Sequence, residues 1–237
     1  MGNLLLRGML AGLLAGFLAF GFAKVFGEPQ VDRAIGFEEQ MAKAKGEPEE
    51  PEIVSRAVQA SIGLFTGVTV VGAAMGGLFA LAFAFVNGRL VQLPPRTATL
   101  IVAALGFMAI YVVPNLKYPA NPPSVGSPET IGLRTQLYFG MIAFSLAALA
   151  IAISAGRQFV AKFGTLNATL IGAAVYIVLA SIAGYMLPPI NEVPGGFPAD
   201  LLWNFRIVSF GIQGILWTAI ALIFGASLER ARTKEAH

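Results

Sequence analysis

Three carboxylates follow the first apolar stretch at spacings that suit one edge of a helix. Asp32 lies four residues after Glu28, and Glu39 lies seven residues after Asp32. On a short helix from about residue 30 to residue 45 the three side chains project in nearly the same direction. Carboxylate oxygens are ligands that divalent cations accept. The spacing predicts either a cation site or a solvated polar border on an amphipathic helix lying on a membrane surface.

A second group of polar side chains lies in a proline-rich segment, residues 117–135. Four prolines between positions 119 and 128 fix much of its backbone. Glu129 and Arg134 are close enough in sequence to form an ion pair. Ser127 before Pro128 predicts a helix start. The segment therefore holds its polar side chains in set positions at the end of a span.

The surrounding chain is too apolar for a soluble protein. Of the 237 residues, 56% are hydrophobic and only 12% are charged, and the mean hydropathy is +0.72. A segment of about 20 apolar residues crosses the hydrocarbon core as a helix. Six stretches meet or nearly meet this length: Leu4 to Phe26, Ala57 to Val86, Thr97 to Leu116, Thr135 to Ala155, Gly164 to Leu187, and Ile207 to Leu228. We predict an all-α polytopic bundle of about six spans, forming a single transmembrane domain over 1–237.

Glycines recur every four residues in the first two spans, which places them on one helix face. Such faces let helices pack closely in membranes. The candidates for helix packing are Gly8, Gly12, Gly16, Gly63, Gly67, Gly72 and Gly76. The first span is long, so we expect it to be retained rather than cleaved as a signal peptide.

The connections between spans indicate the orientation. The turns 87–96 and 156–163 carry basic residues and no acid, and the tail after residue 228 carries three bases against two acids, Glu229 and Glu235. The connection 28–56 is acidic instead. By the positive-inside rule both ends of the chain lie in the cytoplasm, with three outer loops. The acidic outer loop includes the short amphipathic helix.

Residues 97–114 and 167–188 both open with an Ala-Thr-Leu-Ile block and both end in proline, as the first span does at 27–29. Arginines begin the returning spans at Arg56, Arg134 and Arg206, with Glu52, Glu129 and Asp200 shortly before them. This pattern predicts three tandem helical hairpins. Positive-inside anchoring combined with helix-ending prolines would produce the same pattern without a true repeat.

Several functions are disfavoured by residues that the chain lacks. It has no cysteine, and its one histidine is the terminal His237. No acid or histidine lies inside a predicted span, which argues against a self-sufficient proton-coupled pump. No set of nucleophile, base and orienting group is visible, so we do not expect an enzyme. The basic residues are scattered singly, so we do not expect nucleic-acid binding.

Four segments carry motifs that are specific enough to compare with known families: residues 5–16 (LLRGMLAGLLAG), 25–35 (VFGEPQVDRAI), 117–123 (KYPANPP) and 129–135 (ETIGLRT). Through these motifs the sequence resembles the predicted cobalt transporter subunit CbtA family. Its motifs match Glu28, Asp32, Arg33, Lys117, Tyr118, Asn121, Glu129 and Arg134. We therefore add Asn121 and Glu129 to Glu28, Asp32 and Glu39 as candidate metal ligands, and assign Arg33, Lys117, Tyr118 and Arg134 a structural or gating role.

The resemblance implies a multi-pass protein of the cytoplasmic membrane that takes up cobalt for corrinoid synthesis. Co²⁺ would be cargo, with no permanently bound cofactor. Cobalt(II) accepts nitrogen and oxygen ligands, and imidazole would strengthen its site. The resemblance implies a small companion subunit that carries histidines, so we expect the lipid bilayer and this subunit as partners, in a homo- or hetero-oligomer. The alternative is a non-transporting structural or assembly subunit of a larger membrane complex.

Overall fold

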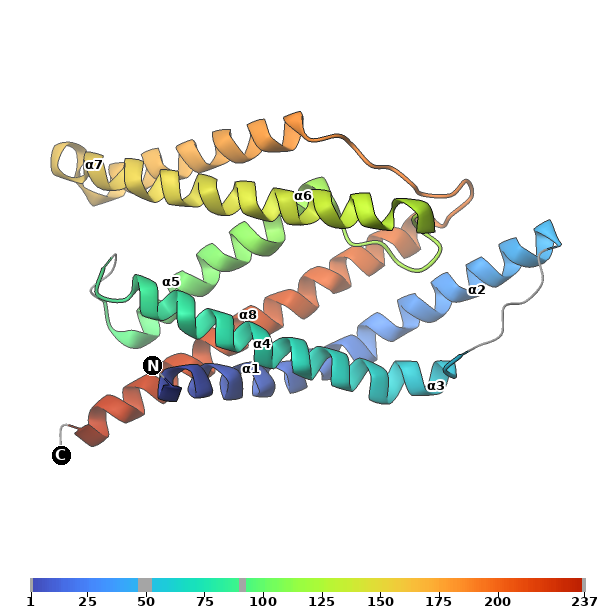
Figure 1. The fold of residues 1–237 in the computed structure, drawn as a ribbon, viewed down its shortest axis with the longest axis horizontal. Helices are drawn as coiled ribbons and strands as arrows, with labels where there is room; N and C mark the ends of the chain where they lie inside the picture. Colours follow the sequence, from blue (N-terminus) through green and yellow to red (C-terminus); the bar gives the residue numbers. More distant parts are fainter. Residues whose placement is uncertain (1, 47–52, 90–92, 236–237) are drawn as a thin grey trace. The chain divides into compact units, whose positions relative to one another are not determined.

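The computed structural model describes residues 2–46, 53–89 and 93–235 as an assembly of helices (Figure 1). The chain divides into two compact units. Unit 1 comprises residues 1–107, 121–124 and 196–237, and unit 2 comprises residues 108–120 and 125–195. The all-helical prediction is confirmed for the described part of the chain.

Unit 1 is built from two long interrupted helices and two further helices. The first runs through α1 (Gly2–Phe22), the π-helical segment η1 (Ala23–Gly27) and α2 (Glu28–Lys45). The second runs through α3 (Arg56–Val58), the π-helical segment η2 (Gln59–Gly63) and α4 (Leu64–Val86). The unit is completed by α5 (Pro95–Phe107) and α8 (Ala199–Glu235).

The centre of unit 1 is a helical bundle in which α1 packs against α4 and α8, while α5 packs against α8. Phe224 of α8 is fully buried and meets the rings of Phe79 and Phe83 edge-on, with centroids 5.8 and 5.5 Å away. Edge-to-face packing of this kind is the preferred arrangement of aromatic pairs. These rings fix α8 against α4.

The start of α1 and the end of α8 lie at the same end of unit 1. Arg7 Nη1 donates to the carbonyl oxygen of Ser227 at 3.4 Å. Nearby, Arg96 Nε pairs with Glu229 Oε2 at 2.7 Å. The start of α1 and the end of α8 therefore share one side of this unit. Which side of the membrane that is stays a prediction.

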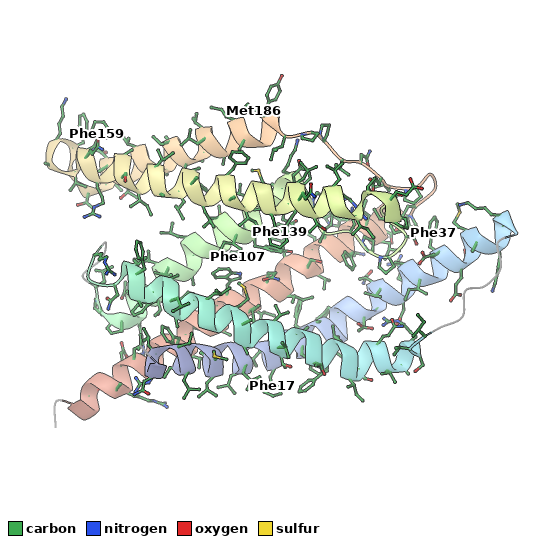
Figure 2. All side chains as sticks on the ribbon, in the orientation of Figure 1. Phe17, Phe37, Phe107, Phe139, Phe159 and Met186 are labelled. Carbon is green, nitrogen blue, oxygen red and sulfur yellow. The ribbon has the colours of Figure 1, made fainter. Side chains whose placement is uncertain are left out.

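Unit 2 contains η3 (Met108–Val112), α6 (Val113–Lys117), the 3₁₀ turn η4 (Pro128–Thr130) and α7 (Ile131–Met186). The chain reverses inside α7 at Gly164, whose φ of 75° and ψ of 168° are not helical. Figure 1 shows the two limbs of α7 running side by side, and Figure 2 labels Phe139 and Phe159 on the first limb and Met186 at the end of the second.

Small residues bring the two limbs of α7 together. A Cβ added to Gly156 would lie 3.0 Å from the carbonyl oxygen of Ala168, and one added to Gly172 would lie 3.0 Å from that of Ala152. The interior also holds a buried hydrogen bond of 2.7 Å between the Ser145 and Tyr176 hydroxyls. Close main-chain approach and interhelical hydrogen bonds are the means by which helices associate in lipid.

Five helices in the described residues are long and apolar enough to cross a membrane: Gly2–Lys45, Arg56–Val86, Pro95–Lys117, Pro128–Met186 and Ala199–Ala231. The fourth includes the reversal at Gly164, so it contains the span predicted at 135–155 and all but the last residue of the span predicted at 164–187. The count of about six spans stays a prediction. Of the three expected hairpins, the first is observed in the packing of α1 on α4.

The prediction that proline ends the first and third spans is wrong. The chain remains helical through Pro29 to Lys45 and through Pro114 to Lys117. A π segment precedes each proline, and its widened turn accommodates the ring that would clash in a regular α-helix. Consequently α2 directly extends the first span. The fifth span does end two residues before Pro188.

Candidate functional site

The side chain of Arg56 joins two of the candidate ligands. Its Nη2 contacts Glu28 Oε2, and its Nε donates to Asp32 Oδ1 at 2.9 Å. The two carboxylates lie one turn apart on α2, as their spacing predicts. Glu28 is buried, with 8% of its surface exposed, whereas the side chain of Asp32 is 60% exposed. A buried carboxylate is tolerated only when it is paired, so Arg56 is what makes the position of Glu28 possible. We call Glu28, Asp32 and Arg56 the Arg56 clamp.

One turn before the clamp, a lysine joins the two π segments of unit 1. Lys24 of η1 donates from Nζ to the carbonyl oxygen of Ala60 in η2 at 2.9 Å. The π hydrogen-bonding pattern displaces backbone donors from their usual partners. Lys24 thus supplies a charged donor to a carbonyl within a distorted turn.

Another side of α2 is held by the first turn of α8 and by the loop that leads into it. Arg33 Nη2 pairs with Asp200 Oδ2 at 2.7 Å, although both side chains are largely exposed. Phe37 packs edge-on against Phe197, with centroids 5.0 Å apart. An exposed ion pair of this kind contributes little by itself. Together with the aromatic contact, it fixes the direction in which α2 leaves the bundle.

The remaining candidate metal ligands do not join the clamp. Glu39 is exposed further along α2. Asn121 accepts a hydrogen bond from Arg206 Nη2 at 2.9 Å through Oδ1. Glu129 is exposed, and its backbone N–H donates to Ser127 Oγ at 3.3 Å. Among the residues that the structure describes, no group of three or more histidine, cysteine, aspartate or glutamate side chains is arranged to hold a metal ion.

In unit 2, Arg134 is bound by a different acid from the one its spacing suggests. The expected partner was Glu129, but Arg134 Nε lies 3.5 Å from Glu192 Oε2, and Arg134 Nη2 donates to the Ser127 carbonyl at 3.1 Å. Glu192 also accepts from the Ser127 N–H at 2.8 Å. The Thr130 hydroxyl, then the Ser127 amide, and to a lesser degree Arg134 hold the pKa of Glu192 below its ordinary value. Glu129 points to solvent at the first turn of the helix, so Arg134 pairs with Glu192 and not with Glu129.

The two other residues assigned to the proline-rich segment have structural contacts. The Tyr118 hydroxyl donates to the carbonyl oxygen of Pro188 at 2.8 Å. The Lys117 ammonium lies 5.7 Å from the centroid of the Tyr118 ring, within cation–π range. These contacts tie the end of α6 to the segment that follows α7.

A family-model comparison decides the relationship of this chain to known proteins. Residues 1–229 match the model described as "Probable cobalt transporter subunit (CbtA)". The chain belongs to the CbtA family. A search of the curated proteins found no match, and a search of the solved structures found none either.

Membership of the CbtA family makes the chain a multi-pass membrane protein and a subunit of a transporter, which works with other subunits. The inner membrane is consistent with this family. A transporter subunit is also consistent with our expectation that the chain is not an enzyme.

In this CbtA chain the arginines that begin the returning spans each bind a polar side chain that lies outside the predicted spans. Arg56 binds Glu28 and Asp32, Arg134 binds Glu192, and Arg206 binds Asn121. Sequence reasoning noted these arginines but not their partners. The acids immediately before them, apart from Glu52, which lies outside the described residues, are not the partners found. The sequence contains one indication that Glu192 could be such a partner: it is the only acid between residues 187 and 199.

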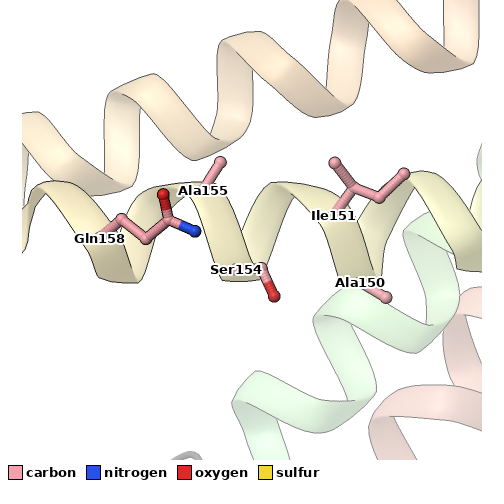
Figure 3. Close-up of a pocket in the computed structure, with 5 residues that line it drawn as sticks. All are labelled: Ala150, Ile151, Ser154, Ala155 and Gln158. Carbon is pink, nitrogen blue, oxygen red and sulfur yellow. The ribbon is translucent and has the colours of Figure 1, made fainter.

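A surface recess on the first limb of α7 carries no comparable chemistry. It is lined by Ala150, Ile151, Ser154, Ala155 and Gln158 (Figure 3). The lining has one hydroxyl and one amide and no ionisable group. A divalent cation would find too few oxygen ligands there. The Arg56 clamp is therefore the better candidate for handling a cation.

Proposed function

We propose that this CbtA-family chain is the membrane subunit of a cobalt(II) uptake system that supplies corrinoid synthesis. The observation that carries the proposal is the family match over residues 1–229. The chain contributes the membrane passage, and Co²⁺ is its cargo.

Within this system, we assign Glu28 and Asp32 to the handling of the incoming cation. They are adjacent carboxylates, and one of them is largely exposed. Carboxylate oxygens bind cobalt(II) less strongly than imidazole does, so two of them form a weak and unselective site. A site with high affinity therefore needs further ligands. We propose that a small membrane subunit bearing histidines supplies them.

The test is the accumulation of radiolabelled cobalt in cells that lack other cobalt importers. The chain is expressed with its small partner, and the amount of each protein in the membrane is measured by immunoblotting. We expect accumulation to require the chain. Loss of accumulation when the chain is omitted, while the partner is still present in the membrane, supports the transport role. Accumulation that is the same without the chain contradicts it.

Carboxylate variants test the assignment of the site separately. We expect Glu28→Gln and Asp32→Asn to lower accumulation several-fold. Glu38→Gln is a matched control, because Glu38 is an exposed acid on the same helix. If both clamp variants accumulate cobalt at the wild-type rate while the chain remains necessary, the transport role stands and the assignment of the cation to this pair is wrong.

A structural role in a larger complex is the second candidate. It is favoured by the close glycine packing of α1 on α4, which builds a rigid scaffold without ionisable groups at its centre. This role predicts co-purification with a larger assembly and no dependence of cobalt accumulation on the chain. A chain that remains alone in mild detergent would contradict it.

A further inference from the structure

The two π segments of unit 1 face one another and are joined by a single hydrogen bond. In a regular α-helix the Leu64 N–H would donate to the carbonyl oxygen of Ala60. Here it donates to the carbonyl oxygens of Gln59 and Ser61 instead. Ala60 O accepts from Lys24 Nζ. Lys24 therefore binds a carbonyl that the distortion of η2 has taken away from the Leu64 donor.

The position of Arg56 depends on the form of η2. A π turn holds one residue more than an α turn, so conversion of η2 to α-helix rotates the preceding helix by about 100° relative to α4. That preceding helix is α3, Arg56–Val58. A rotation of this size moves the guanidinium away from Glu28 and Asp32.

The surroundings allow α3 to rotate while α2 stays in place. On α3 and at the start of η2, Ala57, Val58 and Gln59 are exposed, so their movement displaces no core residue. Another side of α2 is held independently: Arg33 pairs with Asp200, and Ser124 Oγ donates to the carbonyl oxygen of Ala34 at 3.2 Å. The carboxylates thus remain fixed when the arginine leaves.

We propose that Lys24 is a latch that holds η2 in its π form and thereby keeps Arg56 on Glu28 and Asp32. When Lys24 leaves Ala60 O, the carbonyl recovers its α-helical donor, η2 becomes α-helical, and α3 rotates. The two carboxylates are then free of their internal cation. That a divalent cation takes the place of Arg56 rests on the proposed transport function; the latch itself does not.

The absence of native cysteine makes the movement measurable with introduced spin labels. One label is placed at Gln40→Cys on α2 and the other at Ala57→Cys on α3, both exposed positions. Distances are measured by double electron–electron resonance on the purified full chain. Because a helix with its side chains is about 10 Å across, a rotation of about 100° displaces the second label by several ångströms.

Lys24→Met is expected to add a second distance population that the wild-type chain lacks. Lys24→Arg, which retains a cationic donor, restores the single population. Lys162→Met is the matched control, since Lys162 is an exposed lysine of unit 2 beside the Phe163 ring. An unchanged distance distribution in Lys24→Met overturns the latch.

Deletion of Ser61 tests whether the effect of Lys24→Met acts through the π form of η2. Removal of one residue from η2 makes the turn α-helical while keeping the register on both sides, so Arg56 still faces α2. On this background Lys24→Met should no longer shift the distances. A shift of the same size as in the chain with intact η2 overturns the proposal.

Added Co²⁺ distinguishes the latch from the transport assignment. Enrichment of the second population by Co²⁺, and no such effect in a Glu28→Gln/Asp32→Asn chain, supports the replacement of Arg56 by the cation. Because the carboxylate pair alone binds Co²⁺ weakly, the ion is added in large excess. If Lys24→Met shifts the distances and Co²⁺ does not, the latch is upheld and the use of this carboxylate pair by cobalt is rejected.

Discussion

Gly12 of α1 faces the backbone of Gly72 in α4 so closely that a Cβ on Gly12 would lie 2.0 Å from the Gly72 carbonyl oxygen. The contact is reciprocal, because a Cβ on Gly72 would lie 2.6 Å from the carbonyl oxygen of Gly12. The main chains of the two helices are therefore in direct contact. No side chain fits between them, and the approach depends on glycine at these positions.

We predict that Gly12→Val destabilises the packing of α1 on α4. The added side chain must push two backbones apart, and overpacking of this kind costs about 1–3 kcal/mol or more. The free energy of unfolding in mixed micelles measures the effect. Gly67→Val, on the partner helix α4, is the matched control, because a Cβ at Gly67 would meet no atom within 4 Å. Equal stability of the two variants would refute the role of the contact.

The glycine pattern shows which part of the packing the sequence can predict. Spacing alone placed Gly8, Gly12 and Gly16 on one face, and they do face α4. The pair Gly63 and Gly67 has the same spacing but does not line the contact. Gly67 precedes Gly72 by five residues, which corresponds to about 140° from its face of the helix, and Gly63 lies in the π segment. The π segment has no signature that a pattern of apolar residues reveals.

The candidate site was predictable only where its residues are close in sequence. The spacing of Glu28 and Asp32 indicates that they share an edge of α2, and they do. Their partner Arg56 lies more than twenty residues away, across a turn whose length and path the composition does not determine. The pairing of Arg134 with Glu192 was not predicted for the same reason, because the two residues are far apart in the sequence. Tertiary ion pairs depend on where loops place their ends, and local periodicity carries no information about that.

The hydrogen bond between Ser145 and Tyr176 should stabilise the two limbs of α7 by a modest amount. We predict that Tyr176→Phe lowers the free energy of unfolding by about 0.6 kcal/mol, the mean for interhelical hydrogen bonds in membranes. A double-mutant cycle with Ser145→Ala isolates the coupling between the two hydroxyls. Tyr185→Phe serves as the control, because Tyr185 is 92% exposed. Additive effects in the cycle would show that the hydrogen bond contributes nothing.

Gly126 allows the guanidinium of Arg134 to reach its partners. Its φ of 124° is unfavourable for other residues, and a Cβ there would lie 2.0 Å from Arg134 Nη1. We predict that Gly126→Ala costs about 1–3 kcal/mol locally and releases Arg134 from Glu192. Faster hydrogen exchange of residues 121–130 measures this release. Gly132→Ala, where a Cβ meets nothing within 4 Å, should leave the exchange unchanged; similar acceleration in both variants would contradict the prediction.

The contact between Glu192 and the loop around Ser127, residues 121–130, should weaken as the pH falls. The folded-state pKa of Glu192 lies below its ordinary value of 4.5, chiefly because the Thr130 hydroxyl and the Ser127 N–H bind the ionised carboxylate. A carboxylate with a lowered pKa stabilises the folded state fully above its unfolded pKa. That contribution is lost as the pH falls through the folded-state value. We therefore predict that this loop is held at neutral pH and loosens in acid below the ordinary glutamate range.

Hydrogen exchange of residues 121–130, corrected for the intrinsic effect of pH on exchange, measures the loosening. In Glu192→Gln the protection at neutral pH should already be reduced and should change little in acid, because the side chain no longer titrates. Glu129→Gln is the control from the same loop, since Glu129 is exposed and does not bind Arg134. Its profile should follow that of the wild type. If Glu192→Gln retains the wild-type dependence on pH, another group releases the loop and the role assigned to Glu192 is wrong.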